Sequence, residues 1–244
     1  MNDDAASGPR AGAFYREVLE LLTESGTGFL IGGAYAVFHY TGVQRDTKDL
    51  DVFCRPEDCP LILKFFAARG YRVEQTDIRW LAKIYDGDRF VDLIFDTPSN
   101  IGRVDGSWFD HAVAGTLMGI PVKYVAAEDM IWLKSYVQNR LRYDGADIQH
   151  IFLRYGRHLD WTRLLARLNP HWQLLLSSLV LFQFIYPADY RDIVPRWLIS
   201  ELMNRVSGQY ELPAGVRPVC RGPLIDQHQY RIDVDEWGYK VLQV

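Results

Sequence analysis

The sequence predicts a mixed α/β fold followed by a helical C-terminal region, and three observations lead to this prediction. Short apolar runs alternate with helical patterns up to about residue 127. An Asp-Gly pair at 86–87 separates two apolar, aromatic arms, which is typical of a β-hairpin. From Glu128 onward the spacing of apolar residues is mostly helical. A chain of 244 residues is long enough for one α/β domain with a helical addition.

The N-terminal region is expected to hold the sheet. Helical spacing begins at Phe14 and ends near Gly26, and the run "FLIGG" that follows reads as a short buried strand closed by two glycines. The expected helices lie at 14–26, 34–42 and 56–70. The expected strands lie at 29–33, 48–55, 71–76, the hairpin arms 80–85 and 88–95, and two short strands within 115–125.

The C-terminal region is expected to be helical up to about residue 210. The expected helices lie at 128–141, 144–155, 159–168, 171–186 and 190–206, and a late hairpin is expected within 230–244. The predicted domains are a disordered tail at 1–11, an α/β core at 12–127, a helical region at 128–210 and a C-terminal extension at 211–244.

Composition and charge narrow the function classes. The formal net charge is −4, which gives no general case for nucleic-acid binding. The three cysteines, Cys54, Cys59 and Cys220, are too few and too scattered for a disulfide framework or a zinc site. The chain starts without the basic residues and apolar core of a signal peptide, and its most apolar run, 174–186, is too short to span a bilayer. We therefore expect a cytoplasmic protein that does not contact membranes.

The stretch "RDTKDLDVF" places two carboxylates in an otherwise apolar strand. Because side chains alternate along a strand, Asp49 and Asp51 share one face, whereas Leu50 and Val52 point to the other. Two like charges this close repel each other unless a cation sits beside them. Magnesium takes oxygen ligands and commonly uses one or two carboxylates plus substrate phosphates. The competing interpretation is a solvated edge face.

Two further features bear on the same chemistry. Asp92 lies inside the apolar arm "FVDLIF", where a charge is costly unless it is paired or binds a metal. Gly32 and Gly33 stand between a strand and a helix, where glycine lets a phosphate approach the backbone and the helix start offers N–H groups. The glycines also fit a plain tight turn between the strand and the helix.

The order of these motifs resembles the DNA polymerase β-type nucleotidyltransferase superfamily. More narrowly, it resembles the small bacterial members related to AbiEii-type toxins and to antibiotic nucleotidyltransferases. The similarity covers roughly residues 14–155, and the matching residues are Gly32, Gly33, Arg45, Thr47, Asp49, Asp51 and Asp92, with Lys134, Arg142, Asp144 and Asp147 in a further stretch at 126–148. The sequence departs from the family at Tyr143, where a lysine is usual.

The resemblance implies a site and a reaction. Asp49 and Asp51 would hold two Mg²⁺ (or Mn²⁺) ions against a nucleoside triphosphate, and Asp92 would complete the metal site and help to deprotonate the attacking hydroxyl. The residues implied to bind nucleotide are Gly32, Gly33, Arg45, Thr47 and Lys134. Arg142, Asp144 and Asp147 would lie outside the residues that contact the nucleotide, where the two aspartates would orient Arg142 or Lys134. The reaction would move a nucleoside monophosphate from the triphosphate to a hydroxyl acceptor.

The acceptor stays open between two classes. One is RNA, such as a tRNA end, because residues 134–167 carry several arginines that could form a basic face. The other is a small molecule such as an antibiotic or a sugar. A role in a toxin–antitoxin system belongs to the first class. The alternative to an enzyme is a non-catalytic module of the same fold that binds nucleotide or a partner protein, and a further alternative is an unrelated α/β domain with structural acids.

Overall fold

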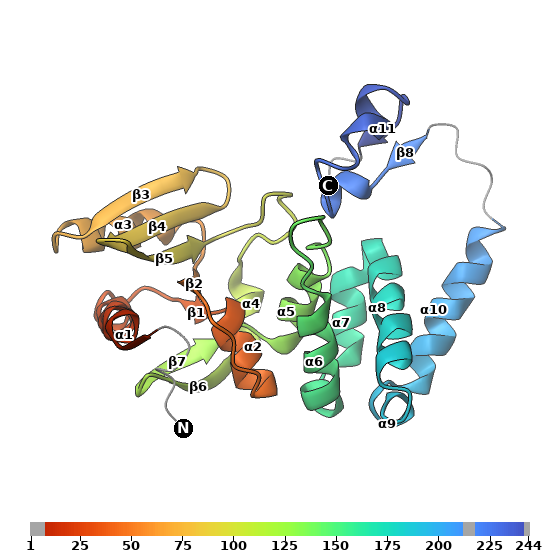
Figure 1. Cartoon of the computed structure of the whole chain (residues 1–244), viewed down its shortest axis with the longest axis horizontal. Coiled ribbons are helices and arrows are strands. Elements are labelled where there is room, and N and C mark those ends of the chain that lie inside the picture. The colour runs from red at the N-terminus through yellow and green to blue at the C-terminus, as the bar shows by residue number, and fades with distance from the viewer. Residues whose placement is uncertain (1–7, 212–217, 242–244) are drawn as a thin grey trace. The chain divides into compact units, whose positions relative to one another are not determined.

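The computed structural model describes residues 8–211 and 218–241. The chain divides into two compact units, Met1–Ala126 and Ala127–Val244, and each is described on its own. The predicted mixed α/β fold with a helical C-terminal half is confirmed (Figure 1). No helix in residues 8–211 and 218–241 is both long enough and apolar enough to cross a membrane.

The N-terminal unit is built on a seven-stranded sheet with the order β3-β4-β5-β2-β1-β7-β6. Its strands are β1 (Leu30–Ile31), β2 (Asp49–Phe53), β3 (Arg72–Asp77), β4 (Leu81–Asp86), β5 (Arg89–Ile94), β6 (Val113–Leu117) and β7 (Ile120–Tyr124). Its helices are α1 (Gly8–Glu24), α2 (Gly33–Thr41), α3 (Cys59–Ala67) and α4 (Gly106–Asp110). Helix α4 was not predicted, and it begins where the Asp105 side chain caps the N–H of Ser107.

Strand β2 lies inside this sheet, between β5 and β1. It runs parallel to β5 and antiparallel to β1, and β1 in turn runs parallel to β7. The pairs β3–β4, β4–β5 and β6–β7 are antiparallel, as expected for strands joined by short turns. Strand β2 therefore has hydrogen-bonded neighbours on both sides, which fixes its position firmly.

The alternation along β2 and β5 separates the core face of the sheet from the other face. Leu50 and Val52 of β2 and Val91 and Leu93 of β5 are fully buried. Burial of such side chains supplies about 1.5–3 kcal/mol each and so fixes which face turns inward. The residues between them, which include the acids, lie on the opposite face and are half-buried.

The β4–β5 hairpin turns one residue later than its Asp-Gly pair suggests. Gly87 and Asp88 form the turn, Gly87 has a φ of +60°, and Asp86 pairs with Arg89. A glycine at the first central position suits a two-residue hairpin turn. This shift of one residue sets which side chains of β4 face those of β5.

The C-terminal unit is helical, and its core gathers apolar side chains such as Phe152, whose ring lies 5.4 Å from the Trp161 ring and 5.5 Å from the Phe182 ring. The helices are α5 (Ala127–Lys134), α6 (Gly145–Tyr155), α7 (Trp161–Leu168), α8 (Trp172–Ile185), α9 (Tyr190–Ile193), α10 (Arg196–Gln209) and α11 (Arg231–Asp235), with 3₁₀ turns at Gly156–His158, Asn169–His171 and Gly222–Leu224. Two short strands, β8 (Val219–Cys220) and β9 (Lys240–Val241), pair in parallel.

The helix expected at 128–141 ends at Lys134, so that prediction was too long. The chain then turns back on itself, because the Asn139 side chain accepts hydrogen bonds from the N–H groups of Leu141 and Arg142. Gln138 and Tyr143 form an isolated antiparallel bridge across this turn. Asparagine favours such turns because its side chain competes with the helix for backbone N–H groups.

The two ends of the chain also differ from the expectations. The late hairpin is wrong within the described residues, since 231–235 form α11, supported by an i,i+4 ion pair between Arg231 and Asp235, and β9 pairs with β8. Residues 242–244, the end of that predicted hairpin, lie outside the described residues, as do 1–7 of the predicted tail. Helix α1 begins at Gly8, so residues 8–11 of that tail are helical.

Candidate active site

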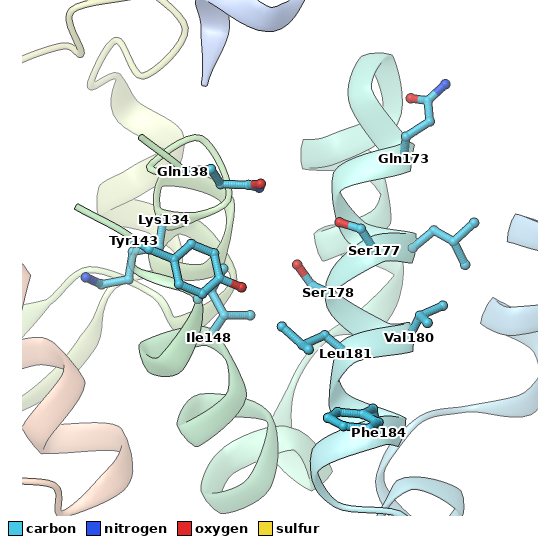
Figure 2. Close-up of a pocket in the computed structure, with 12 residues that line it drawn as sticks. Lys134, Gln138, Tyr143, Ile148, Gln173, Ser177, Ser178, Val180, Leu181 and Phe184 are labelled. Carbon is cyan, nitrogen blue, oxygen red and sulfur yellow. The ribbon is translucent and has the colours of Figure 1, made fainter. Parts of the chain in front are cut away.

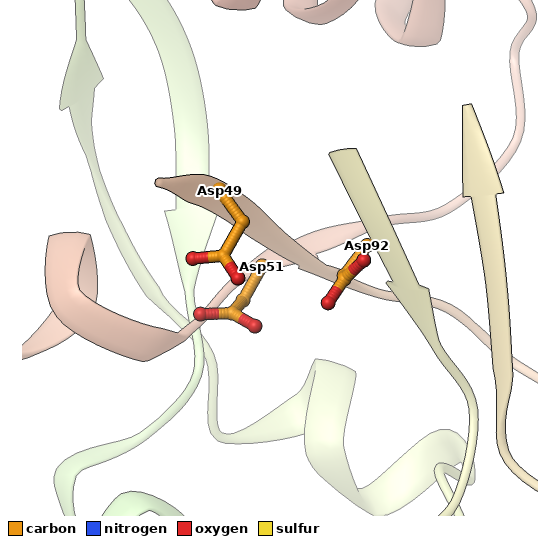
Figure 3. A group of neighbouring side chains, drawn as sticks. All are labelled: Asp49, Asp51 and Asp92. Carbon is orange, nitrogen blue, oxygen red and sulfur yellow. The ribbon is translucent and has the colours of Figure 1, made fainter. Parts of the chain in front are cut away.

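Three carboxylates meet on the half-buried face of the sheet. Asp51 of β2 and Asp92 of β5 are direct partners in the parallel register, and Asp49 lies two residues before Asp51 on the same face. One carboxylate oxygen from each of the three lies within 4.8 Å of the others. Figure 3 shows the carboxyl groups of Asp49 and Asp51 close together, with Asp92 reaching toward them from the neighbouring strand.

This geometry suits a hard divalent cation. Carboxylate oxygens are the ligands that magnesium and manganese prefer, and three like charges at this spacing repel each other when no cation lies among them. The donor atoms come from two adjacent strands with buried, well-packed neighbours, so the backbone holds them in place. The residues present therefore fit a bound Mg²⁺ or Mn²⁺.

Asp92 has a basic partner that the sequence reasoning missed. Lys83 of β4 is its direct cross-strand partner, and the Lys83 Nζ lies 2.6 Å from Asp92 Oδ1. Burial raises the pKa of Asp92, the Asp49 charge raises it further, and Lys83 lowers it by hydrogen bond and charge, with an upward net shift. The residue pattern of a single strand does not show this pair, because the pair depends on the hairpin register.

Thr47 and Arg45 lie just before β2. The Thr47 hydroxyl donates to Asp49 Oδ1 at 2.9 Å and to the Asp49 carbonyl at 3.1 Å. Thr47 thus orients the first carboxylate of the group. Arg45 is exposed in the segment between α2 and β2.

Gly32 and Gly33 place the start of α2 against β2. The Gly32 N–H donates to the Asp51 carbonyl at 3.0 Å, and Gly33 begins the helix with a φ of +54°. A Cβ at Gly33 would stand 1.6 Å from Asp51 Oδ2, and one at Gly32 would stand 2.2 Å from the Phe53 ring. Glycine is therefore needed at both positions, and the helix N-terminus lies directly beside the Asp51 carboxylate.

The other predicted site residues gather in the C-terminal unit. Lys134 Nζ lies 2.8 Å from both Asp144 Oδ2 and Asp147 Oδ2, and Arg142 Nε lies 2.9 Å from Asp144 Oδ1. The Lys134, Asp144 and Asp147 side chains are about nine-tenths buried. Burial would raise the pKa of Asp144, but the bonds and charges of Arg142 and Lys134 outweigh it and lower that pKa.

A second buried ion cluster was missed by the sequence reasoning. Asp129 of α5 is fully buried and lies 2.5 Å from Arg163 and 2.7 Å from Arg167, both on α7. Glu128 also pairs with Arg163, at 3.4 Å. The acidic pair Glu128 and Asp129 at the start of α5 could have indicated this cluster. Acids at a helix start inside an apolar run are buried only when cations pair with them.

The C-terminal unit also contains a cavity of about 770 Å³ between the start of α6 and the face of α8 (Figure 2). Its walls combine the Tyr143 ring and apolar side chains such as Leu181 with the amide of Gln138 and the hydroxyls of Ser177 and Ser178. Among the described residues that line it, the charged one is Lys134, which the two aspartates already neutralise. The cavity thus offers hydroxyl and amide groups and little net charge.

A comparison with protein families identifies the class of protein to which this fold and this group of acids belong. Residues 12–153 match the family described as "nucleotidyl transferase of unknown function" (DUF2204), which covers more than half of the chain. The chain therefore belongs to this nucleotidyl transferase family, which confirms the nucleotidyltransferase resemblance drawn from the sequence. A comparison with curated proteins gives no match.

Several solved structures are similar to this chain. One is the antibiotic-resistance factor ANT(2'')-Ia, with 15% identity, a TM-score of 0.42 and coverage of 82% of this chain and 92% of that one. Another is the lincosamide antibiotic adenylyltransferase LnuA bound to lincomycin, with 15% identity, a TM-score of 0.42 and coverage of 57% and 94%. A third is a putative nucleotidyltransferase from Thermotoga maritima, with 12% identity, a TM-score of 0.39 and coverage of 49% and 80%.

Proposed function

We propose that this chain is a metal-dependent enzyme that transfers a nucleoside monophosphate from a nucleoside triphosphate to a hydroxyl acceptor. The observation that carries the proposal is the in-register pair of Asp51 and Asp92 with Asp49 beside it, one oxygen of each within 4.8 Å. Membership of a nucleotidyl transferase family supports the reaction class. The alternative is a non-catalytic module of the same fold that binds nucleotide or a partner protein.

The three carboxylates would hold two Mg²⁺ or Mn²⁺ ions. These ions, when bound, would neutralise charge that develops on the transferred phosphoryl group and on the leaving pyrophosphate. Asp51 lies beside the start of α2, whose first N–H groups, from Gly33 onward, would face the β- and γ-phosphates, while Gly32 lets them approach the backbone. Arg45 would add a cation for the phosphates, and Thr47 would keep Asp49 oriented.

The reaction itself makes one bond and breaks one. The acceptor oxygen forms a bond to the α-phosphorus, and the bond between that phosphorus and the bridging oxygen breaks, so that pyrophosphate leaves. The hydroxyl proton would pass to Asp92, the carboxylate that completes the acid group. The product is an acceptor joined to a nucleoside monophosphate by a phosphodiester.

For the acceptor we propose a small hydroxyl compound rather than RNA. Five cations of the predicted basic face are ion-paired with carboxylates of the same unit, namely Lys134, Arg142, Arg157, Arg163 and Arg167. These pairs leave less positive charge for a phosphate backbone, on which RNA binding depends. A role as a toxin of the AbiEii type remains a prediction that RNA-dependent transfer would support.

The test is an assay of pyrophosphate release with each of the four nucleoside triphosphates and Mg²⁺ or Mn²⁺. Acceptors are supplied as two panels, transfer RNA and small polyhydroxyl compounds such as aminocyclitol glycosides and sugars. We expect release with one nucleotide and one panel, and none from Asp51→Asn. The matched control is Asp88→Asn, the same change at an exposed acid in the hairpin turn of the same sheet.

Each outcome decides between the alternatives. Metal-dependent nucleotide binding without release in either panel favours the non-catalytic module. Release that needs transfer RNA favours the toxin-like acceptor and contradicts the small-molecule acceptor. The absence of metal-dependent nucleotide binding by the wild type contradicts the proposed function altogether.

A further inference from the structure

Lys83 lies directly in line with the acid group in the register of the sheet. The residues Asp51, Asp92 and Lys83 form one row across β2, β5 and β4, because each is the direct partner of the next in the sheet register. Paired residues of neighbouring strands project from the same face, so the lysine extends the line of carboxylates. The row therefore reads acid, acid, base, with Asp92 in the middle.

The lysine side chain is held at three points. Its strand position is fixed by the hairpin, its Nζ lies 2.6 Å from Asp92 Oδ1, and the same nitrogen lies 3.9 Å from the centre of the Phe90 ring. Its side chain is 17% exposed and that of Asp92 is 14% exposed. A flexible surface lysine loses its ion pair readily to water, whereas this one is screened on most sides.

The ion pair determines which part of Asp92 faces the other acids. A carboxylate has about four lone-pair positions on its two oxygens. Lys83 takes one position on Oδ1, so the carboxylate cannot rotate without breaking a short, charge-assisted bond. The remaining positions stay available toward Asp49 and Asp51.

We propose that Lys83 is a positioning residue of the active site, which fixes the orientation of the Asp92 carboxylate for metal binding. This inference rests on the proposed function. Carboxylates that bind metals are commonly oriented by an outer hydrogen-bond partner, and here that partner is the Lys83 ammonium. Lys83 acts through Asp92 and needs no contact with the substrate.

Two variants of Lys83 separate its role from that of an ordinary ion pair. Lys83→Met keeps the length of the side chain but removes its donors and its charge, and Lys83→Arg keeps both. The control is Lys123→Met, which makes the same change at an exposed lysine on β7 of the same unit. For each protein we would measure kcat, KM for the nucleotide, Mn²⁺ affinity by electron paramagnetic resonance in the presence of a non-hydrolysable nucleotide, and the thermal midpoint.

The expected result is a fall in kcat of about 10- to 100-fold in Lys83→Met, which is the usual effect of losing the partner of a metal ligand. Nucleotide KM should change little, Mn²⁺ should bind more weakly, and Lys83→Arg should recover most of the lost kcat. If Lys83 only neutralised charge, its removal would tighten Mn²⁺ binding and leave kcat unchanged, and this result would overturn the inference. A lower thermal midpoint with normal kcat would overturn it as well.

Wild type and Asp51→Asn are measured first, so that two kinds of failure can be told apart. If the wild type binds no nucleotide with Mn²⁺, the proposed function fails and the inference falls with it. If the wild type is active, Asp51→Asn is not, and Lys83→Met matches Lys123→Met in kcat, the inference alone fails.

Discussion

The Cα of Gly33 lies so close to the Asp51 carboxylate that a Cβ at this position would stand 1.6 Å from Asp51 Oδ2. Gly33 also has a φ of +54°, in the left-handed region that residues other than glycine rarely adopt. The glycine pair was expected to leave room for a phosphate. In the structure it also leaves room for one of the acids, and so ties the start of α2 to β2.

We therefore predict that Gly33→Ala abolishes metal-dependent nucleotide binding while the protein still folds. The new methyl group must displace the Asp51 carboxylate, and the backbone strain costs about 1–3 kcal/mol of unfolding free energy. Urea unfolding measures the second effect, and a thermal shift with Mn²⁺ and nucleotide measures the first. Gly26→Ala is the matched control, because Gly26 has a φ of +68° and a methyl group there would meet no atom within 4 Å. Equal loss of binding in both variants would mean that strain, not contact with Asp51, is responsible.

Thr47 offers a second test of how the acids are oriented. Thr47→Val keeps the shape of the side chain but removes the hydroxyl that donates to Asp49 Oδ1 at 2.9 Å. We expect activity or metal affinity to fall by about 10- to 100-fold, as for other partners of metal ligands. Thr47→Ser should retain most of the activity, because it keeps the donor. Thr76→Val, at an exposed threonine of β3, should behave as the wild type, and a similar loss there would exclude a specific role for Thr47.

Period-two alternation was enough to predict the face that Asp49 and Asp51 share, because buried Leu50 and Val52 fix the other face. The apolar run around Asp92 was enough to mark it as an acid that needs a cation, either an ion-pair partner or a metal. The identity of that cation depended on the hairpin register. With Asp86 and Gly87 as the turn, Leu81 would face Asp92, whereas the turn at Gly87 and Asp88 places Lys83 there. A shift of one turn residue moves the cross-strand partner by two positions.

The C-terminal unit was less predictable for a different reason. Helical spacing of apolar residues continues past Lys134, and a local pattern does not show that the helix stops there or that the Asn139 side chain caps a turn five residues later. The pairing of α5 acids with α7 arginines is likewise a tertiary contact. From sequence alone these arginines looked like a solvated or RNA-binding face.

We predict that Arg163 stabilises the fold and does not bind RNA. It pairs with Asp129, which is fully buried, and with Glu128. Arg163→Met would leave Asp129 with Arg167 alone, and breaking a buried pair by removing one partner costs about 3–5 kcal/mol. Urea unfolding should show this loss, while Arg154→Met, at an exposed arginine of α6, should cost little. Fluorescence anisotropy with labelled transfer RNA should give the same weak binding for all three proteins, and a selective loss in the Arg163 variant would restore the RNA-binding hypothesis.

Asp144 should stabilise the folded protein at neutral pH, and this contribution should be lost in acid. Burial would raise the pKa of this carboxyl, but Arg142 and Lys134 lower it below its ordinary value of about 3.9. A group with a lowered pKa stabilises the folded state above the unfolded-state pKa, and this contribution disappears as the pH falls through the lower folded-state pKa. The contribution of Asp144 to stability is thus lost below about pH 4.

In urea unfolding between pH 7 and pH 3, Asp144→Asn should start less stable than the wild type, and the difference should shrink below pH 4. Asp88→Asn should run parallel to the wild type throughout. A constant difference between Asp144→Asn and the wild type down to pH 3 would show that the ion pairs with Lys134 and Arg142 do not contribute through the charge of Asp144.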